Sequence, residues 1–154
     1  MRDTSQVHRS QSASLPRYAI EFGEWMARVG NERARALGHA KLRPAHNRLI
    51  GFIEFEGSRI VDIAQAQAVS KNAIGQLVTD LEELGYLERV PDPADGRAKI
   101  VRYTDRGKKL LTDTAAIVEQ LDSEVRAVIG ERRLAELRST LAEICHHFGL
   151  NPSA

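Results

Sequence analysis

Apolar residues recur along most of this chain with the three-to-four-residue spacing of amphipathic helices. This spacing predicts helices over residues 15–37, 42–56, 60–67, 70–84, 105–129 and 131–148. The period shortens in one place only, and it predicts two short strands there, over residues 86–90 and 98–103. The sequence therefore predicts a mainly α fold with a small β-hairpin.

The helix over residues 70–84 has both of its ends marked. Ser70 is a good N-cap, and Gly85 stands where a helix commonly ends in a left-handed residue. One face is apolar, and the opposite face is short and polar, with Lys71, Asn72, Gly75, Gln76 and Thr79. Such a face suits a helix that enters the DNA major groove, but a helix that simply faces solvent has the same pattern.

The segments on either side of this helix favour DNA binding. The short helix over residues 60–67 and a tight turn at Ala68-Val69 precede it, which makes a helix-turn-helix candidate. A hairpin follows directly, with a loop of turn formers over residues 91–97. A hairpin in this place predicts the winged variant of the helix-turn-helix.

The first predicted helix, residues 15–37, has an apolar stripe wide enough to pack on two partners. Ser14 can cap its start, Gly38 can end it, and Gly23 and Gly30 allow a bend or break. The residues before it, 1–14, are polar, and we expect a disordered tail there. No internal repeat is found.

Composition excludes several classes of protein. The 154 residues suffice for one domain with a core, 42% are hydrophobic, and the net charge is only +1. No apolar run approaches the roughly 20 residues that span a bilayer, and the N-terminus lacks the apolar region of a secretory signal. A single cysteine excludes an internal disulfide and suits a reducing compartment. We expect a cytoplasmic protein that does not bind a membrane.

Charge is distributed unevenly along the chain. Residues 95–109 carry six cations and two anions, whereas residues 110–154 carry four cations and seven anions. This asymmetry is consistent with one side that faces a polyanion and another that is solvated or self-associating. Ordinary mixing of charges gives the same result in some proteins.

The sequence gives little support for a metal site, a redox-active thiol or a catalytic site. His39, His46 and the adjacent His146 and His147 make a weak metal site, because neighbouring helical residues point about 100° apart. Cys145 lies on an apolar helix face and fits a buried structural thiol better than a redox sensor. No phosphate loop or nucleophile motif is found. We expect that the protein is not an enzyme and that it binds no metal and no cofactor.

Two segments of the sequence resemble motifs of the MarR family of bacterial transcriptional regulators. Residues 95–104, Asp-Gly-Arg-Ala-Lys-Ile-Val-Arg-Tyr-Thr, look like the wing signature of that family, with Tyr103 where leucine is usual. Residues 81–89 resemble its passage from recognition helix to wing. The resemblance covers residues 42–111 by motif and the remainder by the order of helices.

The resemblance implies a homodimer that binds double-stranded DNA and regulates transcription, most often as a repressor. Residues 15–39 and 105–154 would form the helical dimerisation region, and residues 40–104 the winged helix-turn-helix domain. The recognition helix, residues 70–84, would enter the major groove, and the wing, residues 91–98, the minor groove. Members of the family often release DNA when a small aromatic or phenolic ligand binds.

The resemblance also assigns roles to individual residues. Arg97 would enter the minor groove, Asp95 would orient Arg97 or its loop, and Lys99 lies beside them on the wing. The recognition-helix positions are Ser70, Lys71, Asn72, Ala73, Gly75 and Gln76. Asn72 and Gln76 can each bond adenine, Lys71 suits a phosphate, and Ala73 suits a thymine methyl group. This face is less cationic than is usual in the family, which predicts a shallow salt dependence.

A ligand pocket is expected where the dimerisation helices meet the winged domain. The candidates for its lining are Phe22, Trp25, Met26, His46 and Phe52. Two alternative functions stay open at this point. The chain could be an architectural DNA binder with little sequence preference, or a winged-helix module that contacts another protein.

Overall fold

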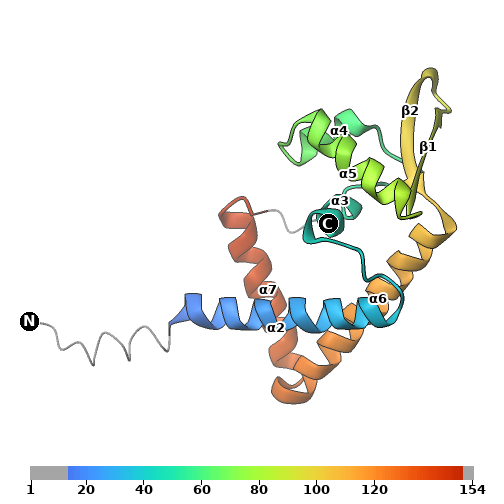
Figure 1. Cartoon of the computed structure of the whole chain (residues 1–154). Coiled ribbons are helices and arrows are strands. Elements are labelled where there is room, and N and C mark those ends of the chain that lie inside the picture. The colour runs from blue at the N-terminus through green and yellow to red at the C-terminus, as the bar shows by residue number, and fades with distance from the viewer. Residues whose placement is uncertain (1–13, 151–154) are drawn as a thin grey trace, which may run out of the picture. The chain divides into compact units, whose positions relative to one another are not determined.

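The computed structural model describes residues 14–150, so nearly all of the predicted polar tail lies outside the described residues. The chain divides into two compact units between Ala40 and Lys41. The first unit contains helix α2 (Leu15–Ala36). The second unit contains the remaining elements, shown in Figure 1: α3 (Pro44–Ile50), α4 (Ile60–Ala66), α5 (Lys71–Glu83), β1 (Leu87–Asp92), β2 (Asp95–Tyr103), α6 (Asp105–Ile129) and α7 (Glu131–His147).

The mainly α fold with one antiparallel hairpin is confirmed. Five helices, α2, α4, α5, α6 and α7, begin and end within two residues of their predicted limits. Helix α2 continues through Gly23 and Gly30 without a break. Ser14 occupies the N-cap position of α2, but its side chain makes no capping hydrogen bond there. Among the described residues, no helix has the length and apolar character needed to cross a membrane.

The predicted helix over residues 42–56 is wrong in its second half. Helix α3 ends at Ile50, and the N–H groups of Phe52 and Ile53 bond to carbonyls only three residues back, at 3.0 and 3.3 Å. The chain then turns through Gly57, which has a left-handed φ of 107°. Phe55, which we expected on the apolar helix face, is 65% exposed. The apolar residues of this turn have helical spacing, but over so few residues that the sequence alone does not distinguish a turn from a continued helix.

The hairpin loop is much shorter than predicted. Strand β1 runs through Asp92 and β2 begins at Asp95, so only two residues connect them, with an irregular register between Pro91 and Asp92. A two-stranded sheet has only edge strands, so Pro91 can pair without donating a ladder hydrogen bond. The turn-forming residues of this segment therefore lie mostly within paired strands.

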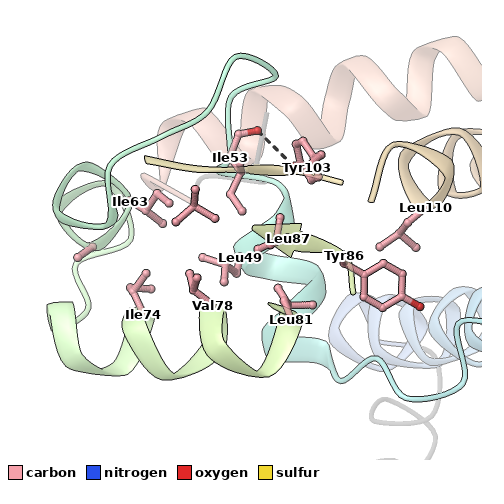
Figure 2. Close-up of a cluster of buried hydrophobic side chains, with 12 residues drawn as sticks. Leu49, Ile53, Ile63, Ile74, Val78, Leu81, Tyr86, Leu87, Tyr103 and Leu110 are labelled. Carbon is pink, nitrogen blue, oxygen red and sulfur yellow. Dashed lines mark hydrogen bonds between the residues drawn. The ribbon is translucent and has the colours of Figure 1, made fainter. Parts of the chain in front are cut away.

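One hydrophobic core holds the winged part of the second unit together (Figure 2). Ile74, Val78 and Leu81 of α5 are fully buried, as the apolar stripe predicts. They pack with Leu49 of α3, Ile63 of α4 and the hairpin residues Leu87 and Val101, together with Tyr86, Tyr103 and Leu110. Because its apolar stripe is fixed in this core, α5 presents its polar face to the outside.

Tyr103 closes the core at the base of the hairpin. Its side chain is 4% exposed. Its hydroxyl lies 2.7 Å from the carbonyl oxygen of Ile50 and 3.2 Å from that of Ile53, so its one proton is shared between the two acceptors; Figure 2 draws the bond to Ile53. The Ile50 carbonyl also accepts the N–H of Ile53 at 3.3 Å, so the group that leucine would leave without this donor is the buried carbonyl of Ile53. Burial, and to a smaller degree the charge of Glu54, raises the pKa of Tyr103 to about 12.

Replacing Tyr103 with phenylalanine is expected to lower the free energy of unfolding by about 1–3 kcal/mol at pH 7, because the buried carbonyl of Ile53 loses its donor and that of Ile50 loses one of its two. The folded-state pKa lies above the ordinary value of 10.0, so the tyrosine favours folding below pH 10 and loses this contribution as the pH rises toward 12. The difference between the two proteins should therefore shrink over this range. Denaturant unfolding at several pH values measures it.

Tyr18→Phe is the matched control, because Tyr18 is largely exposed. It should change the free energy of unfolding by less than about 0.5 kcal/mol. If Tyr103→Phe has an equally small effect at pH 7, the hydrogen bonds to Ile50 and Ile53 contribute nothing to stability.

Candidate nucleic-acid interface

The outer face of α5 is polar, short and accessible. Ser70 caps the helix, with its Oγ accepting the N–H of Ala73 at 3.2 Å. Lys71, Asn72, Ala73 and Gln76 are exposed, and Gly75 is half-buried. A Cβ atom added at Gly75 would have no neighbour within 4 Å, so nothing in the described protein fills the space beside it. The predicted recognition-helix residues are therefore accessible at the start of α5, with Gly75 half-buried.

Arg89 of β1 connects the hairpin to the middle of α5. Its guanidinium pairs with Glu82 and donates to the carbonyl of Gly75 at 3.1 Å and to the Thr79 hydroxyl at 3.2 Å. Its backbone N–H also donates to Glu82, at 2.9 Å. Thr79, which the sequence places on the polar outer face, is thus engaged by the hairpin. This contact fixes the rotation of the helix about its own axis.

The wing residues Asp95, Arg97 and Lys99 are all exposed. Asp95 accepts the backbone N–H of Arg97 at 3.1 Å, so it organises the loop and not the guanidinium. Within residues 14–150, the Arg97 guanidinium has neither a hydrogen bond nor an ion pair. An unpaired and exposed guanidinium on the wing is well suited to a polyanion, because its charge is uncompensated.

A buried carboxylate anchors the wing to the helix-turn-helix. Asp92 is buried, and its Oδ2 accepts from Nε of Arg59 at 2.7 Å while its Oδ1 accepts the N–H of Ala94 at 2.8 Å. The Ala94 N–H, and then Arg59, hold the pKa of Asp92 below its ordinary value. Arg59 is the N-cap residue of α4. Sequence reasoning missed this pair, since its members lie 33 positions apart.

A second polar cluster joins α5 to α3. Gln76 donates from Nε2 to Oδ1 of Asp80 at 3.0 Å, one helical turn away. Oδ2 of Asp80 pairs with the guanidinium of Arg43 and lies 3.4 Å from Nε2 of His46, which is 2% exposed. The Gln76 amide is the main cause that lowers the pKa of Asp80, followed by His46 and Arg43. Sequence reasoning identified Gln76 and His46 but not the carboxylate between them.

The residues predicted to line a ligand pocket fall in both units of the chain. In the first unit, the rings of Phe22 and Trp25 are stacked with centroids 5.8 Å apart. Met26, the next residue in the sequence, is half-buried. In the second unit, Phe52 packs against the core, while His46 is held by Arg43 and Asp80. His46 thus has a structural role that the sequence did not indicate.

The remaining candidate chemistry finds no support in the described part of the chain. Cys145 is half-buried, so it is less enclosed than a buried structural thiol. Between residues 14 and 150, no group of three or more His, Cys, Asp or Glu side chains is arranged to hold a metal ion. The polar face of α5 and the wing are therefore the strongest candidate site.

Comparison with known proteins finds relatives of the winged segment. Residues 41–98 match the model of the MarR family. The chain is 29% identical over 80 residues to the HTH-type transcriptional regulator BilQ of Clostridioides difficile (strain CD3). That match covers 52% of this chain and 54% of BilQ, so the chain spans about half the length of this curated relative.

Solved structures show the same fold. A mutant of S. aureus MepR bound to an oligodeoxyribonucleotide has a TM-score of 0.61 and 17% identity, with 88% of this chain and 98% of that chain covered. CouR from Rhodococcus jostii RHA1 bound to p-coumaroyl-CoA has a TM-score of 0.64 and 24% identity, with coverages of 86% and 92%. Both structures have the winged helix-turn-helix described above.

Proposed function

We propose that this chain, whose winged helix-turn-helix segment belongs to the MarR family, is a sequence-specific DNA-binding regulator of transcription. The observation that carries the proposal is the pairing of an open polar face on α5 with an exposed and unpaired Arg97 on the wing. Arg89 and the Arg59–Asp92 pair fix both elements to one core. BilQ is a transcriptional regulator by name, and the MepR mutant was solved with an oligodeoxyribonucleotide.

Each exposed side chain of this surface has a role that fits its chemistry. Residues 70–84 enter the major groove, where the amides of Asn72 and Gln76 can donate to N7 and accept from N6 of adenine. Lys71 contacts a phosphate, and Ala73 can contact a thymine methyl group. The wing, residues 91–98, lies along the backbone so that Arg97 reaches the negative potential of a narrow minor groove.

The chain acts as a homodimer in this proposal. Large apolar side chains in the helices outside the winged segment are exposed, with Leu15 of α2 77%, Val128 of α6 83% and Phe148, beside α7, 69% exposed. Where such side chains gather into one patch, a partner covers them in most soluble proteins. A second copy that pairs residues 15–39 and 105–154 would cover them and would place two copies of residues 40–104 on one DNA duplex.

The regulator acts in the cytoplasm as a repressor, and a small aromatic or phenolic effector releases it from DNA. Within the first unit, the stacked rings of Phe22 and Trp25 supply an aromatic surface for such a ligand. CouR, a neighbour in fold, was solved with p-coumaroyl-CoA.

A selection of bound fragments from genomic DNA, made with the purified protein at two salt concentrations, tests the proposal. The expected result is an enriched palindrome with half-sites about one helical turn apart, which is the spacing that a two-fold symmetric dimer reads. The genes beside the enriched sites then indicate which compounds to test as effectors.

Other results of the selection would favour the alternatives. Binding without an enriched sequence, lost steeply as salt increases, would indicate an architectural DNA binder. Absence of binding at both salt concentrations would contradict the proposal and favour a winged-helix module that contacts another protein.

A further inference from the structure

The amide of Gln76 is held in one orientation by the carboxylate of Asp80. An ionised carboxylate only accepts hydrogen bonds, so the NH₂ group of the amide, and not its carbonyl, must face Asp80. The contact from Nε2 to Oδ1 measures 3.0 Å. It leaves Gln76, which is exposed, with its carbonyl oxygen and one remaining N–H for a partner outside the protein.

We infer that Asp80 is a positioning residue that selects adenine at the base read by Gln76. The inference rests on the proposed function. Adenine presents the N7 acceptor and the N6 donor in the major groove, and the fixed amide offers one donor and one acceptor to match them. Guanine presents two acceptors, N7 and O6, so an amide that cannot turn places its carbonyl oxygen against a carbonyl oxygen.

Asp80 is itself held from the opposite side by α3. The guanidinium of Arg43 pairs with Oδ2, and His46, buried beneath, lies 3.4 Å from the same oxygen. His46 is fixed in turn, because its Nδ1 accepts the backbone N–H of Arg43 at 3.2 Å. The Arg43 charge compensates a carboxylate that would otherwise repel phosphates on this side of α5. Among residues 14–150, Oδ1 of Asp80 bonds to Gln76 and to no other side chain.

Asp80→Asn distinguishes a residue that orients the Gln76 amide from one that only stabilises the helix. Asparagine keeps the shape of the side chain but offers both a carbonyl and an amide, so Gln76 can turn and still form a hydrogen bond. We expect the preference for adenine over guanine at the Gln76-dependent base to fall about tenfold. Affinity for unrelated DNA should stay the same or rise, because a negative charge near the duplex is removed.

The measurement uses duplexes built on the sequence that the wild-type protein selects. Titrations with wild type and Gln76→Ala first identify the base whose preference depends on Gln76. Titrations with Asp80→Asn, and with the double variant, then show whether the effect of Asp80 passes through Gln76. In the double variant, the change at Asp80 should have no further effect on base preference.

Arg43→Met is the matched control, because it weakens the contact with α3 and leaves the Gln76–Asp80 bond in place. It should lower stability without changing base preference. Thermal unfolding establishes whether each variant folds. If Asp80→Asn does not fold, Asp80→Ala replaces it, because alanine also leaves the Gln76 amide free to turn.

Three results would overturn the inference. If Asp80→Asn weakens binding to the adenine and guanine duplexes equally, Asp80 only supports the helix. If Gln76→Ala alters the preference at no base, Gln76 does not read DNA, although the proposed function stands on the wild-type selection. If the wild-type protein selects no sequence, the proposed function fails first, and the role of Asp80 fails with it.

Discussion

Gly107→Ala is expected to lower the free energy of unfolding by about 3 kcal/mol, the upper part of the usual range for overpacking. Gly107 is buried in the first turn of α6, where that helix crosses the base of the hairpin. A Cβ atom there would lie 2.1 Å from the carbonyl oxygen of Tyr86, and 3.1 and 3.2 Å from side-chain atoms of Tyr103.

The neighbours of Gly107 have little freedom to move away. The Tyr86 oxygen is a backbone atom that accepts the N–H of Thr104 at 3.1 Å, and Oγ1 of Thr104 accepts the N–H of Gly107 at 3.1 Å. Tyr103 is held by the hydrogen bonds of its hydroxyl to the carbonyls of Ile50 and Ile53. Relief of the clash therefore has to shift α6 against the hairpin. The midpoint of thermal unfolding should fall by about 10 °C.

Gly75→Ala is the matched control for this prediction. Gly75 also lies in a helix, but a Cβ atom there meets nothing within 4 Å. Alanine should stabilise the free protein by about 0.5–1 kcal/mol, because glycine loses more backbone entropy on folding. A thermal midpoint for Gly107→Ala that equals or exceeds the wild-type value would show that α6 and the hairpin do not pack as described.

The sequence predicted the helices well wherever a long apolar stripe and a capping residue coincide. The helix that begins after Thr104 is the clearest example: its predicted limits, residues 105–129, are those observed, and Thr104 accepts the N–H of Gly107 as a cap. Prediction failed where the pattern was short. Phe52, Ile53 and Phe55 continue a helical spacing for one turn, but hydrogen bonds to carbonyls three residues back end the helix at Ile50.

The candidate site could be predicted only in part, for a related reason. The exposed face of α5 follows from local spacing, and so does the turn in which Asp95 holds the backbone of Arg97. The contacts that fix these elements join residues far apart in sequence. Arg59 and Asp92 are separated by 33 positions, and Arg43 and Asp80 by 37. No local pattern indicates which arginine will meet which carboxylate, because the pairing is decided by how the core places α3, α4 and the hairpin.

Arg97→Ala is expected to raise the dissociation constant for the selected DNA tenfold or more, with no change in thermal stability. The Arg97 side chain is exposed and, within residues 14–150, makes no ion pair, so its loss removes nothing from the folded protein. On DNA it would remove a weakly hydrated cation from the minor groove. The salt dependence of binding should also decrease, by about one in the slope of log K against log salt. Binding titrations at several salt concentrations measure both effects.

Arg102→Ala distinguishes a specific wing contact from the general loss of positive charge. Arg102 lies five positions further along β2, and its charge is compensated by Glu88, with Nε 2.7 Å from Oε1. Since Glu88 already neutralises it, its removal should change the dissociation constant by less than about threefold. Equal losses for the two variants would mean that the wing contributes only net charge. Unchanged binding by Arg97→Ala would remove the wing from DNA recognition and leave α5 as the sole contact.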